Sequence, residues 1–295
     1  VWLSACFVIP ATLLCLYFRI LWPTALLVGY YSYRTIVPAR RWDWMRRAFS
    51  DRYSYTIVTS NIAFRIVLEE GAEVPKPHSK VVTTVSPHGI LTLGWSYIIS
   101  SGLYFNTQTK WLVAPAMMKL PFIGDIMRWT CCDSCDAKTM SGIMSTGCNI
   151  GLIPGGFQEA TLYTRGKHRL FLKNRKGFVK FALKYGYNIQ PTYVFGEELT
   201  FWTLDLLPTS VAFWLNKFHI PTCIFIGRYL LFMPDDDMDF TVVVGTNIEL
   251  PHIPNPTPED VDKYHALFVE RITGLFDKFK HKYAATGTEA VLEIN

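Results

Sequence analysis

The sequence predicts an α/β fold in which a mostly parallel central sheet is flanked by helices and preceded by an N-terminal hydrophobic membrane hairpin. Short β-branched and apolar segments alternate with helical patterns after residue 50, which is typical of a parallel sheet covered on both faces. Residues 1–33 carry no charge except Arg19, which indicates a separate apolar segment. At 295 residues the chain can hold one large domain or two small ones.

The apolar N-terminal segment is too short for two membrane-spanning helices. One span needs about 20 apolar residues and two need about 40, and Pro10 and Pro23 are expected to kink any helix here. We expect a shallow hairpin, or one span with an interfacial helix; a buried pair of core helices is the alternative. The chain starts with Val1, so we expect further N-terminal residues, and no cleavage site of a signal peptide follows. A cluster of arginines then marks the cytosolic side: Arg34, Arg40, Arg41, Arg46 and Arg47.

Four short apolar segments are predicted as buried strands, and three longer patterns as helices. The first helix begins after the cap Asp136 and runs through Cys148, and the second covers Gly177–Tyr185. The third begins after Thr257, with Pro258 at its first position and acids in its first turn, and continues to about Tyr283. The predicted strands are Val81–Val85, Trp111–Ala114, Ile150–Ile153 and Ile189–Val194.

Composition excludes several classes of function. Seven scattered cysteines argue against a disulfide scaffold, and the single C-x-x-C formed by Cys132 and Cys135 has no second half, so no metal site is expected. The net charge of +5 suits an anionic membrane surface or a polyphosphorylated ligand, but no arginine-rich arm or finger motif indicates nucleic acid. Dinucleotide-binding, zinc-protease and nucleophile-elbow motifs are absent, and Phe157 stands where a phosphate-binding loop needs lysine.

The stretch Ser86-Pro87-His88-Gly89 follows the first predicted strand and marks a candidate site. Ligands bind outside the carboxyl ends of strands in open α/β sheets, and an imidazole there can accept a proton near neutral pH. Gly89 would let another group approach the backbone closely. A lone histidine in a turn is more often structural, so the motif alone does not decide the role of His88.

A second strand ends in a similar way, in the stretch "IGLIPGGFQEA". Gly155 and Gly156 permit a tight turn whose amides could donate to an oxyanion. The carboxylate of Glu159 could orient an imidazole, as the acid does in a catalytic triad. The alternative is that Glu159 only places a negative charge in the first turn of a helix.

Residues 165–186 carry eight cations interleaved with aromatic residues. Such density suits the phosphates of a ligand, and a solvated basic face toward anionic lipid is the alternative. The cations are Arg165, Lys167, Arg169, Lys173, Arg175, Lys176, Lys180 and Lys184.

Residues from about 60 to 295 resemble the type-2 diacylglycerol acyltransferase family, which includes monoacylglycerol and wax-alcohol acyltransferases. The resemblance rests on six sequence motifs that occur in the order and spacing of the family: "SPHG", "PGGFQEA", "LKNRKGFVKFALKYG", "QPTYVFGE", "CIFIGR" and "FDKFKHKYAATGTEAVLEIN". One departure is Ser86, where the family usually has histidine or glutamate, so no role is carried over to this residue.

The resemblance implies a fold like that of glycerolipid acyltransferases and an acyl-CoA-dependent O-acyltransferase that converts diacylglycerol to triacylglycerol. Residues 1–50 would be the membrane hairpin with its basic juxtamembrane segment, and residues 51–295 the cytosolic-facing acyltransferase domain. The implied location is the endoplasmic reticulum membrane or a lipid droplet. The implied partners are acyl-CoA as a substrate, diacylglycerol and a phospholipid surface, with no cofactor and no metal.

The resemblance also assigns roles to individual residues. His88 would be the general base and Glu159 its orienting partner. Residues 198–218, rich in leucine and aromatics, are interpreted as a membrane-dipping segment that admits the acceptor lipid, with core packing as the alternative. The substrate-binding candidates are Pro87, Gly89, Gly155, Gly156, Gln158, Lys173, Asn174, Arg175, Lys176 and Gly177.

Several alternatives stay open from the sequence. The acceptor could be monoacylglycerol or a fatty alcohol, and Ser86 leaves room for a catalytically impaired lipid-binding homologue. A lipid hydrolase is disfavoured because no nucleophile elbow is present. Acyl-chain preference and the existence of a homo-oligomer are not decided.

Overall fold

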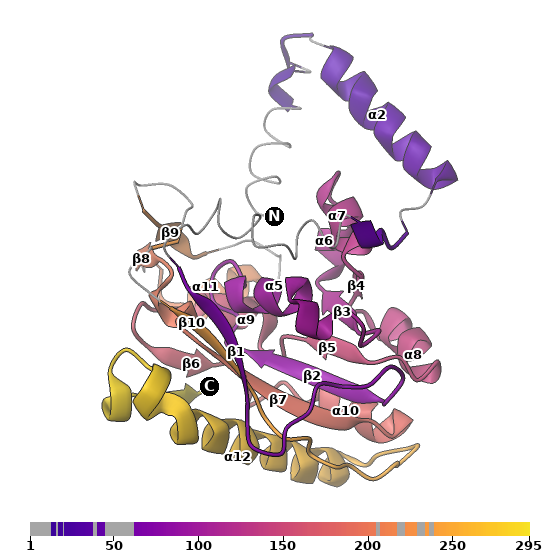
Figure 1. Cartoon of the computed structure of the whole chain (residues 1–295). Coiled ribbons are helices and arrows are strands. Elements are labelled where there is room, and N and C mark those ends of the chain that lie inside the picture. The colour runs from indigo at the N-terminus through magenta and orange to yellow at the C-terminus, as the bar shows by residue number, and fades with distance from the viewer. Residues whose placement is uncertain are drawn as a thin grey trace.

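The computed structural model describes residues 13–15, 17–19, 21–37, 40–44, 62–204, 207–216, 222–228, 234–235 and 239–295. Its centre is a seven-stranded sheet with the order β1-β10-β7-β2-β5-β3-β4 (Figure 1). Every neighbouring pair is parallel except β10 and β7, so the predicted mostly parallel sheet is confirmed. The strands are β1 (Phe64–Leu68), β2 (Val81–Ser86), β3 (Lys110–Val113), β4 (Cys132–Ser134), β5 (Ile150–Leu152), β7 (Asn188–Phe195) and β10 (Phe240–Val244).

Helices cover both faces of this sheet because side chains alternate along each strand. On β10, Val242 and Val244 pack with helix α5 (Leu93–Ser100) in one core cluster, while Val243 belongs to the opposite cluster. That opposite cluster is formed with three further helices, of which α12 runs along the sheet (Figure 1). These helices are α8 (Ala137–Ser145), α10 (Gly177–Tyr185) and α12 (Pro258–Tyr283).

The predicted helices are confirmed, with one difference in length. Asp136 caps α8 by accepting a 2.9 Å hydrogen bond from the backbone of Thr139. The helix ends at Ser145 rather than Cys148, because Gly147 adopts φ +78°, a conformation that stops a helix. Thr257 and Asp260 form a reciprocal capping box at the start of α12.

Shorter elements connect these layers and form two small sheets. Strand β6 (His168–Leu170) pairs in parallel with β11 (Leu292–Ile294), and β8 (Trp202–Leu204) pairs antiparallel with β9 (Ile224–Ile226). The pattern analysis missed both small sheets, together with β1, β4 and β10. The remaining elements are α6 (Pro115–Lys119), α7 (Ile123–Trp129), α9 (Gly156–Thr161), α11 (Thr209–Asn216), and the 3₁₀ turns Gly102–Tyr104, Glu197–Leu199 and Gly287–Glu289.

Helix α2 (Leu21–Ile36) stands away from the sheet on the side of α6 and α7 (Figure 1). The kink expected at Pro23 is wrong, because this proline lies in the first turn, where its missing N–H leaves no hydrogen bond unmade. Pro10 lies outside the described residues, as does part of the expected hairpin. Within the described part of the chain, no helix combines the length and the apolar character that crossing a bilayer requires.

Candidate active site

Three neighbouring parallel strands, β7, β2 and β5, end at the same edge of the sheet, and each is followed by an ionisable residue. His88 follows β2, Glu159 lies in α9 after β5, and Glu197 follows β7. The carboxyl ends of parallel strands are where α/β sheets form their sites. The topology therefore brings together two predicted site residues and one that the sequence analysis did not select.

His88 is half-buried in the turn after β2. Its Nδ1 atom lies 2.9 Å from the backbone oxygen of Gly89. A carbonyl oxygen only accepts hydrogen bonds, so Nδ1 must carry the proton and Nε2 keeps its lone pair. Burial lowers the pKa of His88, and the contact with the Gly89 carbonyl opposes this shift. The imidazole is therefore neutral near pH 7 and able to accept a proton at Nε2.

The carboxylate of Glu159 holds the backbone of His88 and not its ring, so the expected triad-like contact is wrong. Its Oε2 accepts a 2.7 Å hydrogen bond from the main-chain N–H of His88, and its Oε1 accepts a 2.9 Å bond from Phe171. The side chain is buried, with 2% of its surface exposed. Glu159 therefore fixes the position of the turn that carries the imidazole.

The two glycines after β5 have different surroundings. A Cβ atom on Gly155 would lie 2.4 Å from the carboxyl carbon of Glu159, so only glycine fits beside this carboxylate. Gly156 adopts φ +57° and nothing lies within 4 Å of the corresponding position, so the space beside it is open. The proposed oxyanion contact of their amides stays a prediction.

Burial raises the pKa of Glu159 to about 7, while its two backbone hydrogen bonds and the nearby Arg175 act in the opposite direction. Arg175 also donates from Nη2 to Oε1 of Gln158 and lies over the ring of Phe171, 5.4 Å from its centre. Among the predicted substrate-binding residues, Arg175 and Gln158 thus lie beside Glu159. Pro87, another predicted substrate-binding residue, is buried and directly precedes His88.

The rest of the basic run divides between ion pairs and the surface. Lys176 pairs with Asp262 of α12 at 2.6 Å, so its charge already has an acidic partner. Lys173, Asn174 and Gly177 are exposed. Two further cations of the run also meet acids: Arg165 with Asp235 at 2.7 Å and Arg169 with Glu293 at 2.7 Å.

Glu197 is the site residue that the sequence analysis missed. Its Oε1 accepts a 3.1 Å hydrogen bond from the N–H of Leu93 and its Oε2 a 2.8 Å bond from Gly94, at the start of α5. It also lies against Gly89, where an added Cβ atom would approach to 2.3 Å. The signal was present: Glu197 follows a predicted buried strand, in the same relation as His88 to its own strand.

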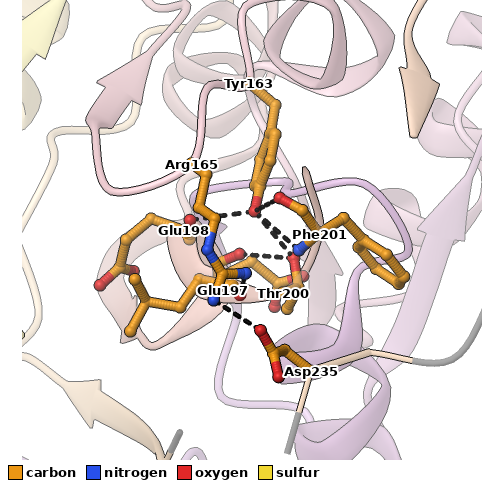
Figure 2. A network of polar contacts seen from close by, with 8 residues as sticks. Tyr163, Arg165, Glu197, Glu198, Thr200, Phe201 and Asp235 are labelled. Atoms are coloured by element: carbon orange, nitrogen blue, oxygen red, sulfur yellow. Dashed lines mark hydrogen bonds and ion pairs between the residues drawn. The ribbon is translucent and has the colours of Figure 1, made fainter. Parts of the chain in front are cut away.

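A buried network keeps the turn of Glu197 in place (Figure 2). The hydroxyl of Tyr163 lies 2.9 and 3.1 Å from the backbone oxygens of Glu198 and Phe201, which share its single donor hydrogen, and it accepts from the N–H of Phe201 at 3.0 Å. Arg165 adds a contact to the Leu199 oxygen beside its ion pair with Asp235. Burial raises the pKa of Glu197 to about 8, with the neighbouring Glu198 acting in the same direction.

Two further residues that the sequence analysis considered, Ser86 and Cys132, are buried in strands of the sheet. Ser86 is fully buried at the end of β2, and its hydroxyl has no hydrogen-bond partner among the described residues. Cys132 is buried in β4, and the described residues contain no group of three His, Cys, Asp or Glu side chains arranged for a metal ion.

Comparison with known proteins places this geometry in a family context. A family model described as diacylglycerol acyltransferase matches residues 14–295. Diacylglycerol O-acyltransferase 2 of Bos taurus is 37% identical over 161 residues, which cover 51% of this chain and 44% of that protein. Acyl-CoA wax alcohol acyltransferase 2 of Mus musculus is 30% identical over 235 residues, covering 73% of this chain and 70% of that protein. The match thus spans less than half the length of the bovine relative.

A solved structure also aligns with the chain. The 1-acyl-sn-glycerophosphate acyltransferase PlsC of Thermotoga maritima gives a TM-score of 0.46 at 16% identity, covering 89% of this chain and 95% of that chain.

Proposed function

Because the chain belongs to the diacylglycerol acyltransferase family, we propose that it transfers a fatty acyl group from acyl-CoA to the free hydroxyl of diacylglycerol. The products are triacylglycerol and CoA. The observation that carries this proposal is the turn after β2, where a neutral His88 imidazole is held by Glu159 through its backbone. An alcohol is a poor nucleophile, so such a base supplies what the reaction lacks.

The reaction proceeds in two steps with His88 as the proton carrier. Nε2 of His88 takes the proton of the acceptor hydroxyl while the hydroxyl oxygen attacks the thioester carbonyl carbon. The tetrahedral intermediate then collapses, the carbon–sulfur bond breaks, and the CoA thiolate leaves with the proton from the imidazolium. Nδ1 keeps its bond to the Gly89 oxygen throughout, which holds the ring orientation.

The surroundings of Glu159 offer groups for the negative charges of the reaction. We assign the oxyanion to amides near Gly155 and Gly156, where the space is open. Arg175 lies at the same place and is available to a phosphate or to the developing charge. Lys173, exposed on the loop before it, is the second cation that we assign to the CoA phosphates.

An apolar surface next to the site supports entry of the acceptor from lipid. Trp202 and Leu204 of β8, Trp214 of α11 and Ile224 of β9 are all exposed. For the three that belong to residues 198–218, this exposure disfavours the core-packing alternative, whereas Phe201 in the same stretch is fully buried. We call the four exposed residues the apolar patch. Helix α11 contacts α9, where the Asn216 side chain donates a 2.7 Å hydrogen bond to the Thr161 hydroxyl. A lipid chain lying on the part of the patch that belongs to α11 would therefore be next to the helix that carries Glu159.

We further propose that residues 1–50 attach the protein to the endoplasmic reticulum membrane or a lipid droplet, with residues 51–295 on the cytosolic side. The support is α2, which is apolar and whose side chains Leu21, Trp22 and Leu26 are exposed. Apolar side chains left exposed along a whole helix indicate a contact surface.

The second candidate acceptor is a fatty alcohol, because a relative that matches 73% of this chain is named a wax alcohol acyltransferase. The test is membranes that contain the protein, labelled acyl-CoA, and diacylglycerol, monoacylglycerol or a fatty alcohol in turn. Labelled triacylglycerol supports the first proposal. Labelled wax ester would show that a fatty alcohol, and not diacylglycerol, is the acceptor. Release of free fatty acid with every acceptor would indicate a hydrolase.

A further inference from the structure

A cavity of about 560 Å³ lies between the C-terminal half of α2 and the α6–α7 pair. Met118 and Leu120 give it an apolar part, and Tyr30 and Tyr31 line it from α2. Figure 1 shows that α2, α6 and α7 lie at one end of the molecule, beyond the edge of the sheet. The cavity is therefore separate from the turn of His88 and has no role in the mechanism above.

One carboxylate in the cavity is already engaged. Asp125 is buried and lies 2.7 Å from Nε of Arg34 and accepts a 2.7 Å hydrogen bond from the Tyr30 hydroxyl. Tyr30 in turn accepts a 2.9 Å bond from the N–H of Phe122. These contacts fasten α2 to α7 and neutralise the charge of Arg34.

Two more cations line the cavity without an acid of their own. Within the described ranges, neither Lys119 nor Arg128 has a carboxylate at ion-pair distance. Arg128 donates from Nη1 to the backbone oxygen of Gly124 at 3.0 Å, which orients its guanidinium and leaves further N–H groups to donate. The cavity thus combines three cations with one carboxylate and has an excess of two positive charges.

The position of this charge points to a lipid headgroup. Helix α2 has 16 residues, a length of about 24 Å, and exposes apolar side chains up to Ile36. The cavity lies at the end of α2 where the charged Arg34, Arg40 and Arg41 begin. If α2 contacts lipid, this level corresponds to the headgroups, with acyl chains beside the apolar part of the helix.

We propose that this cavity binds the headgroup of an anionic glycerophospholipid, with its phosphate between Lys119 and Arg128 and its acyl chains along α2. This inference rests on the proposed attachment of the protein to a lipid surface. The site orients α2 relative to α7, because the same cavity contains the contacts of Tyr30 and Arg34 with Asp125.

The test uses the full chain and two kinds of vesicle, phosphatidylcholine alone and phosphatidylcholine with a minor fraction of phosphatidylserine. The double variant Lys119→Gln/Arg128→Gln removes the two cations of the cavity. The matched control Lys138→Gln/Lys263→Gln removes the same charge from exposed lysines of α8 and α12. Phosphatidylserine should increase the affinity of the wild-type protein for vesicles. We expect this increase to be at least about 10-fold smaller in the first variant and unchanged in the control. Thermal melting checks that both variants are folded.

Three outcomes would overturn the site: an equal loss in both variants, no loss in either, or full displacement of the wild-type protein from phosphatidylserine vesicles by inorganic phosphate at matched ionic strength. A rise in KM for acyl-CoA in the Lys119/Arg128 variant, with its phosphatidylserine preference unchanged, would also overturn it and assign the cavity to acyl-CoA. Acyl transfer is measured on the same samples. Failure of the wild type to transfer acyl groups would reject the proposed function and leave the vesicle result readable by itself.

Discussion

The main-chain nitrogen of His88 donates a 2.7 Å hydrogen bond to Oε2 of Glu159, across 71 residues of sequence. The other carboxylate oxygen binds the main chain of Phe171, which precedes the loop of Lys173 and Arg175. One buried carboxylate thus joins the turn of the candidate base to the loop assigned to acyl-CoA. A movement of either loop would change the geometry of both.

Replacing the candidate base should remove acyl transfer. We expect His88→Ala to lower kcat by about 10²–10⁴, the usual contribution of a positioned base. Because burial lowers the pKa of His88, kcat/KM of the wild type should fall only below about pH 6.5. The control is Ser86→Ala, which removes a buried hydroxyl without a hydrogen-bond partner and should leave turnover nearly unchanged. Wild-type turnover in His88→Ala would reject the role.

The buried acids should make the protein less stable as the pH rises. Burial raises the pKa of Glu197 from 4.5 to about 8, so the native state holds a proton that the unfolded chain has already lost. The free energy of unfolding then falls between about pH 4.5 and 8, by up to about 1.4 kcal/mol per pH unit for one group. Glu197→Gln cannot ionise, so its melting temperature should depend less on pH over this window. If the melting temperature of Glu197→Gln depended on pH as much as that of the wild type, the raised pKa of Glu197 would be contradicted.

Glu197 should also position the catalytic turn through Gly89. A Cβ atom at residue 89 would lie 2.3 Å from the Glu197 side chain, and the backbone there has φ +61°. We expect Gly89→Ala to lower kcat and to destabilise the fold by more than about 1 kcal/mol. Gly142→Ala is the control, because nothing lies near its Cβ position in helix α8, and it should stabilise by about 0.4–1 kcal/mol. Equal effects of the two substitutions, measured by melting and turnover, would show that Glu197 exerts no constraint.

The loop after Phe171 should contribute unequally to acyl-CoA binding. Lys173→Gln should raise KM for acyl-CoA and leave KM for the acceptor, since this lysine is exposed next to Arg175. Arg175→Gln should in addition lower kcat, because its guanidinium contacts Gln158 beside Glu159. Lys176→Gln should lower the free energy of unfolding by less than about 1 kcal/mol, as expected for a surface ion pair, and should raise KM for acyl-CoA the least of the three. A large rise in KM from Lys176→Gln alone would reverse this order.

The apolar patch should touch lipid in the full-length protein. Trp202→Glu and Trp214→Glu are expected to weaken flotation with vesicles and to raise KM for the acceptor, because each places a charge on an exposed apolar surface. Leu103→Glu is a control on an exposed apolar side chain outside the patch, and it should leave KM for the acceptor unchanged. Unaltered acceptor kinetics in both tryptophan variants would limit the patch to a folding role.

The sequence by itself determined the parts of the molecule that depend on local pattern. Strand Val81–Val85, helix Gly177–Tyr185 and the capped helix after Thr257 follow from β-branched runs, amphipathic spacing and capping residues. His88 and Glu159 could also be selected locally, because each follows a buried strand at a glycine-containing turn. Strand β4 could not, since its three residues Cys132–Ser134 are too short to carry a pattern.

Only the tertiary structure decided what these residues contact. The pairing of β2 between β5 and β7 brings Glu159 and Glu197 to the two sides of His88, and such non-local pairing leaves no periodic trace in the chain. Charge in sequence did not distinguish Arg175, which turns toward Glu159, from Lys176, which pairs with Asp262 on a helix 86 residues away. Burial removes water from a carboxylate, and this physical change gives Glu159 and Glu197 raised pKa values that their residue type alone does not imply.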